Sequence, residues 1–226
     1  MHAKQSPPQN KRSQYTCVCL KAFFVFLAFF QPSPGFSLTI LCLGDSLTEG
    51  YGLKPEEAWP SLLEASLKKN IPSVKVINAG ISGATTASGP SRIKWHLKTL
   101  EKQPIDILIL SLGANDALRG LDVKDSAKNL VTTIELAQEK KIKVFLTDIK
   151  APPSLGAEFT KKFEAIYPQI AKTKKVTLIP FFLEGVAGNP KLNLPDGIHP
   201  NSEGQKIVHK NVENFLCKNI KCDSKR

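Results

Sequence analysis

The sequence of 226 residues lacks the features on which several classes of protein depend. Its most apolar run, Ala22–Phe30, is nine residues long, whereas a helix that crosses a bilayer needs about 20. The five cysteines do not show the spacing of metal ligands, and aromatic and basic residues do not interleave as they do on nucleic-acid-binding surfaces. The chain also contains no internal repeat or low-complexity tract. These absences argue against a zinc module, a nucleic-acid-binding protein and a repeat protein.

Acidic residues are absent from the first 35 positions, which carry four basic side chains and then the apolar run. Ser33-Pro34-Gly35 places small residues at the −3 and −1 positions of a cleavage site. This order of segments is typical of a secretory leader. We therefore expect residues 1–35 to be a signal peptide, or a membrane anchor if they are not cleaved. Residues 36–226 are expected to form one domain that is exported to the periplasm or secreted.

The composition of the full chain is that of a globular protein, with 42% hydrophobic and 23% charged residues and a net charge of +11. The positive surplus indicates either a solvated basic surface or attraction to anionic membranes or acidic substrates. Cys42 lies in an apolar run and is expected to be a buried thiol. Cys217 and Cys222 lie near the C-terminus, and an oxidising compartment would allow them to pair.

Segments typical of strands and helices alternate along the domain. Strands are expected at 37–43, 74–78, 105–110, 142–147 and 176–179, and helices at 55–69, 91–102, 122–140, 158–171 and 202–215. Because the strands are unbroken runs rich in Leu, Ile and Val, they are expected to lie in a parallel sheet between two layers of helices. Ser202 and Gln205 predict a capping box at the start of the last helix.

A serine suited to nucleophilic attack follows the first strand, in Gly44-Asp45-Ser46-Leu47. Functional loops follow the carboxyl ends of the strands in sheets of this kind. Gly44 permits a tight turn that exposes the hydroxyl, although ordinary turns from strand to helix also contain serine. Asp45 is expected to brace this turn.

Three further groups would complete the machinery for acyl transfer. Asp196 stands three residues before His199, so its carboxylate can orient the imidazole of a general base, although a lone loop histidine is more often a surface residue. Gly80 and Gly83, in the loop after the second strand, offer accessible backbone N–H groups, although ordinary turns also use glycine. Asn115 follows the third strand and is either a helix cap or a donor to an oxyanion. Together they supply a nucleophile, a base with its acid, and oxyanion donors.

These residues resemble the motifs of the SGNH (GDSL-type) hydrolase family, and in particular its bacterial group of thioesterase I, lysophospholipase L1 and arylesterase. The similarity runs from about Leu38 to Phe215 and includes GDSLTEGYGL, AWPSLL, NAGISGATT, LGANDALRG, AIYPQIAK, IPFFLE and DGIHPN. Two positions depart from the pattern, since Ala114 stands where a second glycine is more usual and Gly80 where serine is. The α/β-hydrolase elbow G-x-S-x-G does not fit, because residue 48 is threonine.

The resemblance implies a flavodoxin-like α/β fold, a three-layer α/β/α sandwich with a mostly parallel sheet of five strands. It implies a triad of Ser46, His199 and Asp196, with an oxyanion hole formed by the N–H groups of Ser46 and Gly83 and by the Asn115 side chain. Residues 36–226 would then be the catalytic domain, working through an acyl-enzyme and needing no metal or organic cofactor.

The implied substrates are small-molecule acyl esters: lysophospholipids, aryl or fatty-acyl esters, and acyl-CoA thioesters. Ile81, Leu118 and Leu155 are candidates for the lining of an acyl groove, or are ordinary packing residues. A carbohydrate acetylesterase and a non-catalytic binding module are the alternatives. We expect a monomer that contacts no nucleic acid and whose basic surface allows peripheral contact with an anionic membrane.

Overall fold

The computed structural model describes residues 1–2, 37–220 and 222. The predicted leader, residues 1–35, lies outside this description apart from its first two positions.

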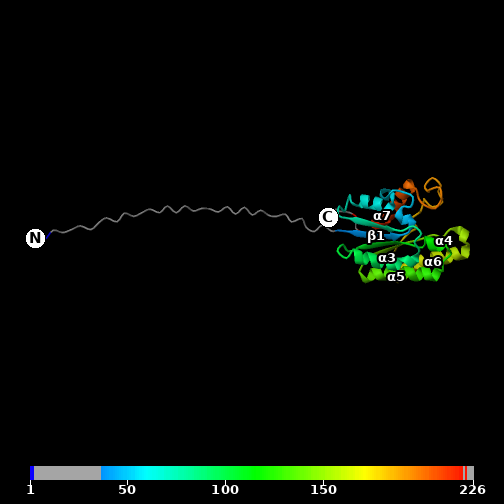
Figure 1. The fold of residues 1–226 in the computed structure, drawn as a ribbon, viewed down its shortest axis with the longest axis horizontal. Coiled ribbons are helices and arrows are strands. Elements are labelled where there is room, and N and C mark those ends of the chain that lie inside the picture. The colour runs from blue at the N-terminus through cyan, green and yellow to red at the C-terminus, as the bar shows by residue number, and fades with distance from the viewer. Residues whose placement is uncertain (3–36, 221, 223–226) are drawn as a thin grey trace. The chain divides into compact units, whose positions relative to one another are not determined.

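Five parallel strands form the centre of the fold (Figure 1). They are β1 (Thr39–Gly44), β2 (Lys75–Gly80), β3 (Ile107–Ser111), β4 (Lys143–Thr147) and β5 (Thr177–Ile179), and they lie in the order β2-β1-β3-β4-β5. Every neighbouring pair is parallel. The inner strands β1 and β3 are buried along their whole length, as expected for unbroken apolar runs. Each strand begins and ends within two residues of its predicted limits.

Helices cover both faces of this sheet, so the predicted three-layer α/β/α architecture is confirmed (Figure 1). On one face, α2 (Trp59–Leu67) packs against α7 (Ser202–Asn219). On the other, α5 (Val123–Glu139) lies between α3 (Gly89–Thr99) and α6 (Ala157–Lys174). Short helical segments at the loops complete the chain: α1 (Ser46–Glu49), α4 (Ala114–Leu118) and the 3₁₀ turns η1 (Pro55–Glu57), η2 (Thr86–Ser88) and η3 (Pro153–Leu155).

The helix predicted for residues 55–69 is wrong at its start. A 3₁₀ turn occupies Pro55–Glu57, Ala58 is extended, and α2 begins at Trp59. Pro60 lies in the first turn of α2, where its missing N–H is not needed. Two prolines close together therefore start two separate elements.

The capping box predicted for Ser202 and Gln205 is also wrong. Asn201, the residue before Ser202, caps α7 instead. Its side-chain oxygen accepts from the N–H groups of Glu203 and Gly204 at 3.1 and 3.0 Å. The Ser202 hydroxyl donates to Glu57 at 2.6 Å, and Gln205 Oε1 accepts from the Trp59 N–H at 2.9 Å. Both side chains therefore join α7 to the start of α2.

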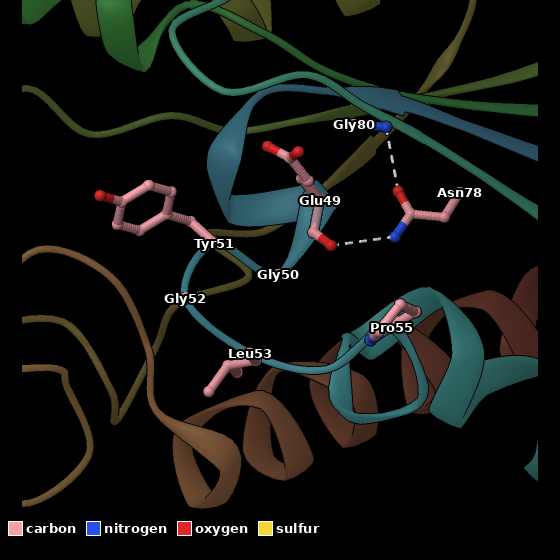
Figure 2. Close-up of a pocket in the computed structure, with 8 residues that line it drawn as sticks. All are labelled: Glu49, Gly50, Tyr51, Gly52, Leu53, Pro55, Asn78 and Gly80. Atoms are coloured by element: carbon pink, nitrogen blue, oxygen red, sulfur yellow. Dashed lines mark hydrogen bonds between the residues drawn. The ribbon is translucent and has the colours of Figure 1, made fainter.

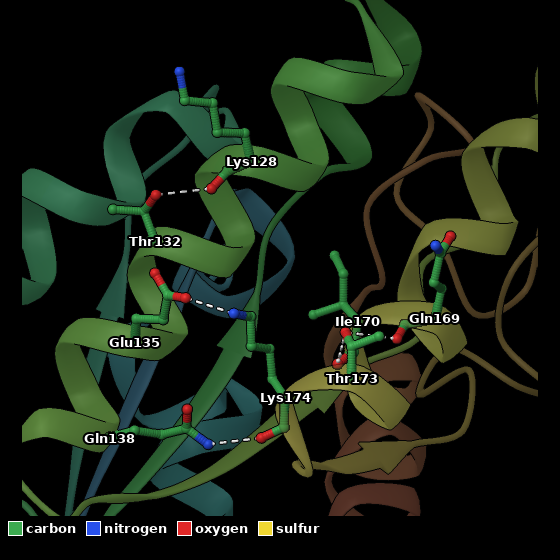
Figure 3. Close-up of polar contacts among 8 residues, drawn as sticks. All are labelled: Lys128, Thr132, Glu135, Gln138, Gln169, Ile170, Thr173 and Lys174. Atoms are coloured by element: carbon green, nitrogen blue, oxygen red, sulfur yellow. Dashed lines mark hydrogen bonds and ion pairs between the residues drawn. The ribbon is translucent and has the colours of Figure 1, made fainter.

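Polar contacts fasten the end of α6 to α5 (Figure 3). Lys174 Nζ lies 2.5 Å from Glu135 Oε1, and Gln138 Nε2 donates to the Lys174 carbonyl at 2.9 Å. The second bond satisfies a carbonyl at the helix end that has no partner within the helix. This contact fixes the point from which the chain enters β5.

The three cysteines among the described residues behave as the sequence suggested. Cys42 is fully buried in the core, and Cys217 forms a disulfide with Cys222. Among residues 1–2, 37–220 and 222, no helix has both the length and the apolar character needed to cross a membrane.

Candidate active site

The turn after β1 presents Ser46 at the first position of α1. Asp45 caps this helix, since its Oδ1 accepts from the Leu47 N–H at 3.0 Å, so the prediction that Asp45 braces the turn is confirmed. Gly44 is required here because a Cβ would lie 2.1 Å from Thr48 Oγ1 and 3.0 Å from the Ser111 carbonyl oxygen. The tight turn leaves Ser46 8% exposed.

A chain of hydrogen bonds joins Ser46 to the loop before α7. His199 Nε2 lies 2.9 Å from Ser46 Oγ, and His199 Nδ1 lies 2.8 Å from Asp196 Oδ2. With its proton on Nδ1 facing the carboxylate, the imidazole offers its Nε2 lone pair to the serine hydroxyl. The structure thus brings together three predicted residues from opposite ends of the sequence.

The other carboxylate oxygen organises the backbone of the same loop. Asp196 Oδ1 accepts from the N–H groups of His199 and Ile198, at 3.0 and 2.9 Å. These two bonds, with the contact to the imidazole, lower the pKa of Asp196 to about 2. The carboxylate is therefore ionised at neutral pH and can stabilise an imidazolium.

Backbone contacts close this loop into a compact unit. Leu194 N–H donates to the His199 carbonyl at 2.7 Å, and Asn201 N–H donates to the Leu192 carbonyl at 2.9 Å. An isolated antiparallel bridge pairs Asn193 with Pro200. The base and its carboxylate are thus held by the residues that lead directly into α7.

Two of the three predicted oxyanion donors, Gly83 and Asn115, lie on segments that contact each other, the loop after β2 and the start of α4. Gly83 follows β2 and has a φ of 75°, a conformation that favours glycine. Asn115 lies in the first turn of α4, where its Nδ2 donates to the Ala84 carbonyl at 3.1 Å and keeps a second hydrogen. Arg119 Nη2 donates to the Gly83 carbonyl at 3.0 Å. Among the described residues, no acceptor receives the N–H of Ser46 or of Gly83.

A buried carboxylate behind these donors ties the two loops together. Asp116, next to Asn115, is 1% exposed. It accepts from the N–H and the hydroxyl of Thr86, at 2.8 and 2.5 Å, and from the Ser126 hydroxyl at 3.1 Å. The sequence analysis missed the role of Asp116, because its partners are a 3₁₀ turn and a helix that only the tertiary structure brings close.

Two other residues near the site were missed as well. The ring of Tyr51 lies 4.5 Å from the His199 ring, centroid to centroid, at an angle of 38°. Glu49 ends α1, and its carboxylate accepts from the hydroxyl of Ser82, the neighbour of Gly83. The only signal in the sequence was their place just after Ser46.

A pocket of about 400 Å³ opens beside these two residues (Figure 2). Residues 49–53, 55, 78 and 80 line it. The predicted groove residues Ile81, Leu118 and Leu155 do not. Ile81 and Leu118 are 53% and 47% exposed, whereas Leu155 is half-buried against the core.

The ionised form of Asp45 is destabilised by its burial next to Ser46. Asp45 is 1% exposed, and its Oδ2 has no hydrogen-bond partner among the described residues. Burial raises the pKa of Asp45 to about 6, against the opposing influence of the Leu47 N–H and of the charges of His199 and Arg92.

Comparison with known proteins gives consistent matches. Residues 42–207 match the model of the GDSL-like Lipase/Acylhydrolase family. An arylesterase of Vibrio mimicus is 38% identical over 181 residues, 80% of this chain and 89% of that protein. The thioesterase 1/protease 1/lysophospholipase L1 of Escherichia coli K12 is 35% identical over 185 residues, 82% of this chain and 86% of that protein.

Solved structures show the same likeness. The crystal structure of TesA superposes with a TM-score of 0.75 at 34% identity, covering 80% of this chain and 99% of TesA. The structure of AlinE4, described as an SGNH-hydrolase family esterase, gives a TM-score of 0.67 at 40% identity, covering 83% of this chain and 99% of AlinE4.

Proposed function

The chain belongs to the GDSL-like lipase/acylhydrolase family and is an ester hydrolase, and we propose that Ser46, His199 and Asp196 are its catalytic triad. The observation that carries this proposal is the unbroken chain of contacts, 2.9 Å from Ser46 to His199 and 2.8 Å from His199 to Asp196. These distances lie within hydrogen-bond reach, as proton transfer requires.

The reaction proceeds in two halves. His199 Nε2 takes the Ser46 proton as Oγ attacks the acyl carbonyl, and the N–H groups of Ser46 and Gly83 with the Asn115 amide receive the oxyanion. The imidazolium, stabilised by Asp196, then gives its proton to the leaving oxygen or sulfur. Water attacks the acyl-enzyme by the same route in reverse and releases the acid. Besides the substrate and water, each step uses side chains and backbone groups of this chain.

The substrate we propose carries an apolar acyl chain, as in lysophospholipids, fatty-acyl or aryl esters and acyl-CoA thioesters. The support for this is the exposure of two large apolar side chains close in sequence to the oxyanion donors, Ile81 two residues before Gly83 and Leu118 three residues after Asn115. Turnover of p-nitrophenyl esters from C2 to C16 tests this point. A strict preference for acetyl groups would favour the carbohydrate acetylesterase alternative.

The test of the triad is Ser46→Ala. It should abolish p-nitrophenyl ester hydrolysis and labelling by a fluorophosphonate probe while the circular dichroism spectrum stays that of the wild type. Ser88→Ala, a change of the same kind outside the triad, is the control. Undiminished turnover in Ser46→Ala would refute the triad, and an unlabelled, inactive wild type would favour a binding module.

We further propose that the domain is exported. The disulfide between Cys217 and Cys222 supports an oxidising compartment, in agreement with the basic and apolar leader. Fractionation of cells that make the full chain, with thiol labelling of each fraction, tests this. Recovery of the protein in the cytoplasm with both thiols free would contradict it.

A further inference from the structure

The pocket beside Tyr51 lies on the side of the site from which a leaving group must depart. His199 gives its proton to the departing atom, so the alcohol part of the ester has to lie next to the imidazole. Tyr51 has its ring against that imidazole, 4.5 Å between centroids, and the same residue lines the pocket. An alcohol that accepts the proton of His199 can therefore extend past Tyr51 into the pocket.

The walls of the pocket are fixed by short-range contacts. Gly50 and Gly52 have φ values of 85° and 76°, which direct the chain tightly around Tyr51. The Asn78 side chain donates to the Glu49 carbonyl at 3.2 Å and accepts from the Gly80 N–H at 2.9 Å. These are the bonds drawn in Figure 2. The pocket is thus formed before a ligand arrives, and its volume of about 400 Å³ is within the range of small-molecule sites.

The chemistry of the pocket favours a cation. The residues that line the pocket include one acidic residue, Glu49, and one aromatic residue, Tyr51 (Figure 2). Glu49 Oε2 accepts from Ser82, and its Oε1 has no partner among the described residues. None of the residues that line the pocket is Lys or Arg, although the chain has 31 basic and 20 acidic residues. A carboxylate and an aromatic ring in the lining of one pocket are a combination that binds organic ammonium groups.

We propose that this pocket is the alcohol-side subsite of the enzyme and that Glu49 and Tyr51 select esters whose leaving group carries an ammonium group. The proposal rests on the proposed function, because it uses His199 as the donor to the leaving oxygen. Glu49 and Tyr51 act on the choice of substrate and take no part in the transfer of protons.

The test compares two esters that differ only in charge: butyrylcholine and 3,3-dimethylbutyl butyrate. The measured quantity is kcat/KM for butyrylcholine divided by kcat/KM for 3,3-dimethylbutyl butyrate. Glu49→Gln should lower this ratio about three- to tenfold, the loss expected for one partly solvated charge pair. The glutamine can still accept from Ser82, so the loop beside Gly83 keeps its contact. Glu56→Gln removes the same charge from a residue outside the pocket and should leave the ratio as it is.

A second measurement needs no variant. Choline should inhibit p-nitrophenyl butyrate hydrolysis by the wild type more strongly than 3,3-dimethylbutanol does, by a similar factor. Equal inhibition by the two alcohols, or an equal fall of the ratio in Glu49→Gln and Glu56→Gln, would overturn the subsite. A change of acyl-chain preference in Glu49→Gln with a constant ratio would assign the pocket to the acyl chain and also overturn it. If the wild type does not cleave p-nitrophenyl butyrate, the proposed function itself fails.

Discussion

Removal of the Asp116 carboxylate should destabilise the protein and slow its reaction together. In Asp116→Ala the Thr86 N–H and the Thr86 hydroxyl lose their acceptor in a buried place. The Ser126 hydroxyl keeps the Asp122 carbonyl at 3.0 Å as an alternative. Two buried donors without an acceptor, at about 1–3 kcal/mol each, give a loss of roughly 2–6 kcal/mol in the free energy of unfolding.

Asp116→Asn separates the loss of a charge from the loss of acceptors. Its oxygen can accept from the Thr86 N–H, and its NH₂ group can donate to the hydroxyl oxygens of Thr86 and Ser126, which rotate to suit. We therefore expect a loss of only about 1 kcal/mol for this variant. The kcat of Asp116→Ala should fall about ten- to a hundredfold, because the neighbouring Asn115 and the loop of Gly83 lose their common support.

Urea denaturation and p-nitrophenyl butyrate kinetics measure both effects. Asp125→Ala is the matched control, since Asp125 is exposed in the first turn of α5 and should cost less than about 1 kcal/mol. The reasoning is refuted if Asp116→Ala unfolds within 0.5 kcal/mol (about the usual surface effect) of the wild type. It is equally refuted if Asp116→Asn is as unstable as Asp116→Ala.

Three other predictions follow from the geometry. Asn115→Ala should lower kcat about 10²–10³-fold with little change in KM, as measured on p-nitrophenyl esters, and a purely KM effect would contradict its role as an oxyanion donor. Burial raises the pKa of Asp45 to about 6, so the contribution of Asp45 to the free energy of unfolding falls as pH rises from about 4 to 7. The free energy of unfolding of Asp45→Asn, measured by urea titration, should therefore rise by up to about 3 kcal/mol relative to that of the wild type over this pH range. A difference between the two proteins that does not change with pH would show that Asp45 does not titrate there. Cys222→Ser opens a loop of sequence separation 5 and should cost about 2 kcal/mol, and dithiothreitol should lower the melting temperature of the wild type but not of this variant.

The sequence was sufficient for the parts of the fold that local patterns determine. The inner strands β1 and β3 are buried on both faces, so their unbroken apolar composition was enough to predict them as strands. The rule that function follows the carboxyl ends of strands then brought Ser46, Gly83 and Asn115 to one edge. This rule does not place His199, which lies in the loop before α7; its role was indicated by the nearby Asp196 and by the family resemblance.

The errors have a common physical origin in contacts between distant segments. Gln205 was assigned to a cap on its own helix, but its side chain accepts from the Trp59 N–H, 146 positions away. Tyr51 was overlooked because only the folded chain brings its ring to His199. The residues next to a side chain in the sequence do not reveal such pairs. The same side chain can form its hydrogen bond or its packing contact with a nearby residue or with a distant one.

The contact between Ser46 and His199 spans 153 positions, which has a consequence for when the enzyme becomes active. During synthesis the nucleophile is made long before its base, and the loop that holds His199 leads directly into α7, the last helix. A partly made chain therefore holds a serine without a proton acceptor. Ester hydrolysis begins only when α7 has docked against α2, so the onset of activity in a refolding or translocation experiment reports the completion of the domain.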